Sequence, residues 1–231
     1  MTSCVLSIGT SHPWNVAGIG RDAVVGAELG VRVLTAVAAV SAQDEHGVRA
    51  LYVLPAAALR AQLDALAGAQ IAAARIGALG SAENVDLVAA FLHSIAPVPA
   101  VVDPVFAASA GGALADEAAI VALRDHLATL VNVVLTPNLC EAAMLLGRER
   151  IERGELEEAA SALYGRGAHA ILLKGGHLAG DPIDALASSD GVEAFDAPRI
   201  GAAMPGTGCT LAMALACELA RGRPLRNAVA A

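Results

Sequence analysis

Short runs rich in β-branched residues alternate with longer Ala- and Leu-rich runs along this sequence, and the alternation limits the folds open to it. We predict strands at residues 5–8, 31–40, 50–54, 72–76, 100–103, 131–136 and 168–173. Segments of helical periodicity lie between most of them, at residues 17–29, 56–67, 82–95, 116–127 and 152–164. This β-α-β order is typical of a parallel sheet covered on both faces, so we predict a three-layer α/β/α fold with a mostly parallel central sheet.

The composition is uniform over the 231 residues, so we expect a single domain at residues 1–231. Although 56% of the residues are hydrophobic, no apolar stretch is long enough to predict a membrane span. The N-terminus lacks the basic leader of a secretory signal, so a cytoplasmic protein is expected. The four cysteines have no metal-finger or disulfide spacing and are expected to be reduced: Cys4, Cys140, Cys209 and Cys217.

The charge composition favours a small ligand over a nucleic acid. The net charge is −8 and only 3% of the residues are aromatic, whereas a nucleic-acid surface needs basic residues and stacking rings. If the ligand is phosphorylated, local groups such as Lys174 and helix dipoles must attract it, because the overall field repels anions.

A glycine-framed turn, Gly206-Thr207-Gly208-Cys209-Thr210, opens onto the apolar helical run 211–220. The first N–H groups of such a helix lack partners, and glycine lets an anion approach the backbone closely. We therefore expect a phosphate cradle here. Cys209 would face the same anion, and the helix N-terminus is expected to lower its pKa, which makes it a candidate base or nucleophile.

Unusual residues follow three other predicted strands. These segments are Asp103-Pro104-Val105, Thr136-Pro137-Asn138-Leu139-Cys140-Glu141 and Lys174-Gly175-Gly176-His177. Each alone has an ordinary interpretation: a turn, a helix start, or a surface loop in which a lysine only favours solubility. Because the carboxyl ends of parallel strands share one rim, however, we expect the segments to converge there.

Together these segments supply the groups that phosphoryl transfer requires. Asp103 and Glu141 are candidates to hold Mg²⁺ directly or through water, and Lys174 is a cation for a polyphosphate. Asn138 and Glu141 are three residues apart, so they share a face of a helical first turn and could address one hydrated ion. The glycine turn adds an anion hole and a base.

On these residues the chain resembles the ribokinase-like superfamily, and within it the hydroxymethylpyrimidine and phosphomethylpyrimidine kinases of thiamine biosynthesis. The resemblance covers essentially the whole chain. Besides the three strand-end segments and the glycine turn, it includes Ala17-Gly18-Ile19 followed by Asp22, Ser41-Ala42-Gln43, and Ile76-Gly77-Ala78-Leu79.

The resemblance implies a ribokinase-like fold without a separate lid domain, a homodimer, and MgATP-dependent phosphorylation of a small heteroaromatic alcohol. The implied acceptor is the hydroxymethyl group of 4-amino-5-hydroxymethyl-2-methylpyrimidine, and its monophosphate is a possible second acceptor. Cys209 would be the base, and the backbone of Gly206, Thr207 and Gly208 would stabilise the transferred phosphoryl group.

The resemblance also implies binding roles. Asp103 and Glu141 would serve the metal, and the implied nucleotide-binding residues are Lys174, Asn138, Thr136 and Gly176. Gln43 would hydrogen-bond the pyrimidine, and the implied acceptor-binding set is Gln43, Gly18, Ala17 and Val105.

Several residues depart from the family pattern on the acceptor side. The first loop, residues 9–16, is one residue longer and lacks the family's acidic residue and double glycine, Ala78 replaces a Met, and Pro205 replaces a His. A pyridoxine/pyridoxal kinase and a catalytically silent ligand-binding sensor therefore stay open as alternatives.

Two further enzyme classes have weaker support. Residues 18–23 satisfy a loose dinucleotide fingerprint, but some nine residues separate it from the strand that it should follow directly. A hydrolase using Cys209 with His177 would need a third, orienting residue, and none is evident.

Overall fold

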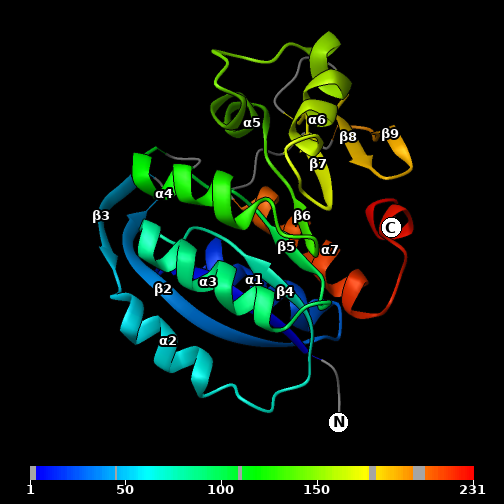
Figure 1. Ribbon diagram of the computed structural model, residues 1–231. Helices are drawn as coiled ribbons and strands as arrows, with labels where there is room; N and C mark the ends of the chain where they lie inside the picture. Colours follow the sequence, from blue (N-terminus) through cyan, green and yellow to red (C-terminus); the bar gives the residue numbers. More distant parts are fainter. Residues whose placement is uncertain (1–3, 45, 109–110, 177–180, 200–205) are drawn as a thin grey trace.

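The computed structural model describes residues 4–44, 46–108, 111–176, 181–199 and 206–231, and these form one sheet with helices on both faces (Figure 1). The strand order is β3-β2-β1-β4-β5-β6-β7-β8-β9. Strands β2, β1, β4, β5, β6 and β7 are parallel, and β3, β8 and β9 add antiparallel pairs at the two edges. The strands are β1 (Cys4–Ser11), β2 (Arg32–Asp44), β3 (Gly47–Val53), β4 (Ile71–Ile76), β5 (Ala100–Val102), β6 (Val133–Leu135), β7 (Ala170–Lys174), β8 (Ile183–Ser188) and β9 (Gly191–Asp196).

The helices divide between the two faces of the sheet, as the three-layer prediction requires. One face packs against α1 (Gly18–Glu28), α7 (Thr207–Ala220) and α8 (Leu225–Val229). The other face packs against α2 (Ala56–Asp64), α3 (Ala82–Ser94), α4 (Glu117–Ala122), α5 (Leu139–Leu146) and α6 (Leu156–Tyr164). A π-helical turn, Leu123–Leu127, continues α4, and a 3₁₀ turn, Arg153–Glu155, precedes α6.

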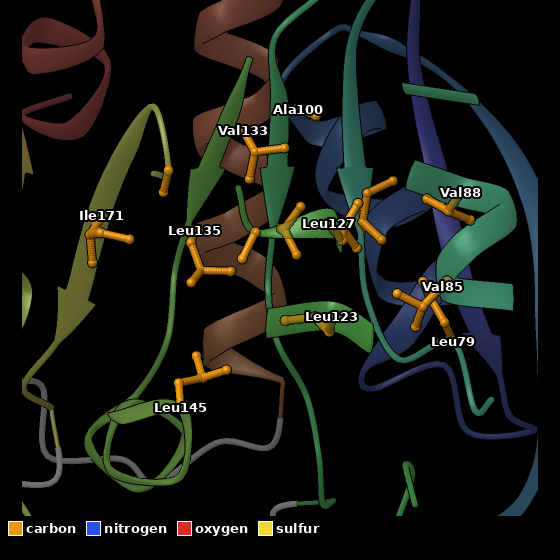
Figure 2. Packing of buried hydrophobic residues seen from close by; sticks show 14 of the residues in the cluster. Leu79, Val85, Val88, Ala100, Leu123, Leu127, Val133, Leu135, Leu145 and Ile171 are labelled. Atoms are coloured by element: carbon orange, nitrogen blue, oxygen red, sulfur yellow. The ribbon is translucent and has the colours of Figure 1, made fainter. Parts of the chain in front are cut away.

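The central strands are buried on both sides, which explains their nearly continuous apolar sequences. Successive side chains alternate between the two cores. On β7, Ile171 and Leu173 join the core under α3 to α6, whereas Leu172 joins the core under α7. Figure 2 shows the larger core, where Leu123 and Leu127 lie near the side chains of the central strands.

The seven predicted strands and five predicted helices are all present, with ends shifted by a few residues in most cases. The sequence analysis missed the β8–β9 hairpin and the short helix α8, and of α5 it predicted only the first turn. The hairpin strands read IDALAS and GVEAFD. Three residues of β8 are buried but β9 is mostly exposed, and neither strand has the long apolar run of the central strands. Helix α5 has only eight residues, which gives a weak periodic signal.

None of the helices in the described residues combines the length and apolar character needed to cross a membrane.

Asn84 on α3 ties together three segments near the carboxyl ends of the strands. Its side chain is fully buried, and its amide nitrogen lies 3.4, 3.2 and 3.0 Å from the carbonyl oxygens of Ala38, Leu54 and Leu79. These carbonyls belong to β2, to the segment after β3 and to the loop after β4. One amide therefore fixes three connections close to the rim of the sheet.

We expect Asn84→Ala to lower the free energy of unfolding by about 2 kcal/mol, because several buried carbonyls lose their donor at once. Urea denaturation measures this loss. Asn132→Ala is the matched control, since the Asn132 amide donates to a single carbonyl, that of Val98, at 2.7 Å. An equal or larger loss in the control would contradict the assigned role of Asn84.

Candidate active site

The carboxyl ends of β1, β4, β5, β6 and β7 meet at one rim, and helix α7 begins there. Three of the predicted groups come together at this point. Lys174 Nζ lies 2.7 Å from Asp103 Oδ1, and a Cβ placed on Gly208 would lie 3.2 Å from the same Nζ. The start of α7 therefore lies directly over the Lys174–Asp103 pair, as the sequence predicted for its strand ends.

Lys174 is the only lysine in the sequence, and its side chain is largely buried at the end of β7. Burial alone would lower its pKa, but the carboxylates of Asp103 and Glu141 raise the pKa above its ordinary value. The ammonium group is therefore charged. Its backbone N–H donates to Pro137 O at 2.8 Å, which fixes β7 beside the start of α5.

A capping box positions Asn138 and Glu141 at the start of α5. Asn138 Oδ1 accepts from the Glu141 N–H at 2.9 Å, and Glu141 Oε2 accepts from the Asn138 N–H at 2.7 Å. Both side chains thus occupy the first turn of the helix, as predicted. Thr136 precedes them and is fully buried, with Oγ1 3.4 Å from Val102 O.

The turn at Gly206 needs glycine for two reasons. Gly206 is the N-cap of α7 and has φ 80°, and a Cβ there would lie 1.9 Å from Val16 O. The first turn of α7 is thereby pressed against the backbone of residues 16–17. Gly18 has φ 61°, and its Cβ would lie 2.3 Å from Thr10 O. The predicted anion turn and the predicted acceptor segment therefore pack backbone to backbone.

The expected lowering of the Cys209 pKa is wrong. Cys209 is in the first turn of α7, but its thiol is buried, and burial raises the pKa above its ordinary value. The charges of Asp103 and Asp22 raise it further, whereas the Arg75 guanidinium opposes them. Loss of solvent therefore outweighs the helix N-terminus that the sequence analysis invoked.

The sequence analysis missed Arg75, which lies at the centre of the site. Arg75 is on β4 with a side chain that is 1% exposed, and it lies 3.0 Å from Asp103 Oδ2 and 3.3 Å from Asp22 Oδ2. Asp22 in turn accepts a 2.6 Å hydrogen bond from Ser7 Oγ. One charge in an otherwise apolar strand, IAAARI, was the available signal.

The predicted acceptor-binding residues lie around the same rim. Ala17 is the N-cap of α1, and its N–H lies 3.2 Å from Nε2 of the buried His12. Val105 and Ala78 line one small hollow together with Phe106. Gln43 lies near the end of β2, where its Oε1 accepts from Ser41 Oγ at 3.3 Å. Among the described residues, no hydrogen bond joins it to Cys209 or Lys174.

The remaining predicted residues are less central. Gly176 is exposed after β7, and its carbonyl accepts from Arg199 at 3.1 Å. Thr207, the first residue of α7, is exposed. His177 and Pro205 lie outside the described residues. Residues 12–17 separate β1 from α1, which argues against the dinucleotide fingerprint at residues 18–23.

Comparisons with known proteins show which family the chain belongs to. The family profile described as phosphomethylpyrimidine kinase matches residues 13–231. A hydroxymethylpyrimidine/phosphomethylpyrimidine kinase from Streptomyces coelicolor is 38% identical over 229 residues, which cover 98% of this chain and 84% of the relative. One from Rhizobium meliloti is also 38% identical, over 100% of this chain and 88% of the relative.

Solved structures give the same result. A phosphomethylpyrimidine kinase from Clostridium difficile 630 has a TM-score of 0.86 at 27% identity, covering 99% of this chain and 95% of that one. An ADP complex of Bacillus subtilis pyridoxal kinase has a TM-score of 0.90 at 27% identity, covering 100% and 88%. The ribokinase-like fold is thus confirmed, and the chain belongs to the phosphomethylpyrimidine kinase family of phosphotransferases.

Proposed function

We propose that this chain is a MgATP-dependent kinase of thiamine biosynthesis that phosphorylates 4-amino-5-hydroxymethyl-2-methylpyrimidine on its hydroxymethyl group and then accepts the monophosphate as a second substrate. The observation that carries the proposal is the position of Lys174 and Asp103 under the first turn of α7, with Nζ 3.2 Å from a Cβ placed on Gly208. A cation and the first N–H groups of α7, which have no partner within the helix, meet there, and this is the arrangement that a transferred phosphoryl group needs.

The polyphosphate is bound by Lys174 and by the N-terminus of α7. Thr136, Asn138 and Gly176 complete the nucleotide side, since all three follow β6 or β7 at the same rim. An ADP complex is known for the similar Bacillus subtilis kinase, which supports ATP as the phosphoryl donor.

The carboxylates fit a magnesium ion that keeps most of its water. Among the described residues, no group of three His, Cys, Asp or Glu side chains could enclose a metal. Magnesium bound with nucleotide phosphates needs only one or two carboxylates. Both Asp103 oxygens are bound by cations, so Asp103 fits a water-mediated role, whereas Glu141 uses only Oε2 in its capping box and can offer Oε1. The metal would neutralise charge on the phosphates.

In the transfer step, Cys209 accepts the proton of the acceptor hydroxyl as that oxygen bonds to the γ-phosphorus. The bond from the γ-phosphorus to the bridging oxygen breaks, and ADP leaves. The backbone N–H groups of residues 206–209 stabilise the charge on the transferred group. Burial disfavours the Cys209 thiolate, so nearby cations are needed to support it, and the charges of Arg75 and Lys174 act in this direction.

Ala17, Gly18, Gln43 and Val105 form the acceptor side in this proposal. Pyridoxal is the second candidate acceptor, favoured by the TM-score of 0.90 to a pyridoxal kinase. The silent sensor remains the non-enzymatic alternative, and turnover decides between them.

We also propose that residues 1–231 form one kinase domain that works as a cytoplasmic homodimer. Apolar side chains at the edge of the sheet support a dimer, since Tyr52 on β3 and its cross-strand partner Val40 are 66% and 43% exposed.

Cys209→Ala should lower kcat by roughly two to four orders of magnitude while ADP binding is retained, because only proton transfer is lost. ADP release from MgATP is measured with hydroxymethylpyrimidine, its monophosphate, pyridoxine and pyridoxal as separate acceptors. Cys217→Ala is the matched control, since Cys217 is a buried cysteine of the same helix that packs in the core. Undiminished turnover in Cys209→Ala would remove the base assignment, and no turnover of any acceptor by the wild type would favour the sensor.

Lys174→Ala should raise KM for MgATP and leave KM for the acceptor nearly unchanged, because the lost ammonium faces the phosphates. Because Lys174 is the only lysine, an amine-reactive reagent labels one side chain besides the N-terminus. MgATP should protect this lysine in wild-type protein, as followed by peptide mass spectrometry. Labelling at the same rate with and without MgATP would contradict the assignment.

Burial raises the pKa of Glu141 to about 7, with a further upward contribution from Asp103 that Lys174 opposes. Between the ordinary value of 4.5 and about 7, the folded metal-free protein retains a proton that the unfolded chain has lost. The free energy of unfolding of wild type relative to Glu141→Gln should therefore fall as pH rises through this range and level off above it.

Urea denaturation at a series of pH values tests this pH dependence. Glu155→Gln is the matched control, because Glu155 accepts from the Glu152 N–H in an exposed capping box. Parallel pH curves for wild type and Glu141→Gln would contradict the expectation.

A further inference from the structure

Arg75 is a buried charge in an otherwise apolar strand. It is the one charged residue of β4, and it faces the core under α7 from the middle of the sheet, with β1 on one side and β5 on the other. Removing a guanidinium from water costs several kcal/mol, and an apolar side chain of similar size generally gives equal or greater stability. A role at the active site would explain why the charge is present.

The guanidinium is placed between two carboxylates. Nη2 lies 3.0 Å from Asp103 Oδ2, and Nη1 lies 3.3 Å from Asp22 Oδ2. Because Lys174 holds the other oxygen of Asp103 at 2.7 Å, that carboxylate is fixed by one cation on each oxygen. Gly77 supplies the space, since a Cβ there would lie 2.2 Å from Nη1.

These contacts join the acceptor side to the phosphate side. The chain of bonds runs from Ser7 through Asp22 on α1 to Arg75 on β4, then to Asp103 after β5 and Lys174 on β7. Arg75 is the link between the two halves, so its loss separates α1 from the carboxylate under the α7 turn.

Arg75 also bears on the Cys209 thiol. The charged groups that act on Cys209 are Arg75 from β4, Lys174 from β7, Asp22 from α1 and Asp103 after β5, and only the two cations among them favour the thiolate. Burial would lower the pKa of Arg75, but Asp22, Cys209 and Asp103 raise it above its ordinary value, so the guanidinium stays charged.

We propose that Arg75 is a positioning residue of the kinase, which holds the Asp103 carboxylate in place and supplies the positive charge that supports the Cys209 thiolate. The proposal rests on the proposed function of Cys209 as base. Arg75 itself touches neither substrate in this scheme.

The test compares Arg75→Lys, Arg75→Met and the double variant Arg75→Met/Asp22→Asn. The Met variant leaves two carboxylates facing each other and should lose stability. The double variant removes one of those charges and should recover it, as followed by urea denaturation. Arg166→Met is the control, since Arg166 donates to Leu145 O on the opposite core.

We expect the acidic limb of the pH profile of kcat/KM for the acceptor to shift to higher pH by about one unit in both Met variants. At a pH on this limb, kcat/KM should therefore fall about tenfold. Arg75→Lys should restore most of the loss, because it keeps a charge. If the double variant regains stability together with wild-type kcat and an unmoved limb, Arg75 is only structural and the proposal fails.

A second readout does not depend on turnover. The rate at which iodoacetamide alkylates Cys209 is followed by peptide mass spectrometry over a range of pH, with Cys140→Ser to remove the exposed thiol. The rate at a fixed pH below the thiol pKa should fall about tenfold in the double variant, which corresponds to one pKa unit. An unchanged rate would overturn the proposal. A lowered rate in a protein without kinase activity would show that Arg75 supports the thiolate although the proposed function fails.

Discussion

The site depends on a buried ion-pair chain that runs across the sheet from Asp22 through Arg75 and Asp103 to Lys174. Charged groups removed from water are costly unless each one meets a partner. The chain therefore requires α1, β4, the end of β5 and β7 to keep their relative positions. The ion pairs therefore hold the rim of the sheet in place more firmly than the loops at the strand ends could by themselves.

Close backbone packing completes the same rim. The start of α7 can lie over the ion pairs because Gly206 approaches the backbone of residues 16–17 and Gly208 approaches Lys174. The capping box of α5 holds Glu141 nearby. The groups proposed to bind phosphate, transfer a proton and bind a metal thus share one small volume, where the charge of each group alters the pKa of its neighbours.

Much of the fold could be predicted because its signals are local. The apolar β-branched runs of the buried strands and the periodicity of the longer helices gave the three layers, and the motifs at the strand ends gave Lys174, Asp103 and the glycine turn. The hairpin β8–β9 and the short helix α8 were missed, and α5 was predicted only at its first turn, because their patterns are weak. Arg75 was missed because a strand is recognised by its apolar residues, and the single charged residue in β4 does not disturb that pattern.

The sequence by itself determined the order of the elements, the family and the types of residue at the rim, since these follow from periodicity and from motifs of contiguous residues. Only the tertiary structure decided the state of the groups within the site. The helix N-terminus suggested a lowered pKa for Cys209, but burial raises it. Desolvation and the distance to a cation on another strand are set by packing between segments far apart in the sequence, so a local sequence pattern does not indicate them.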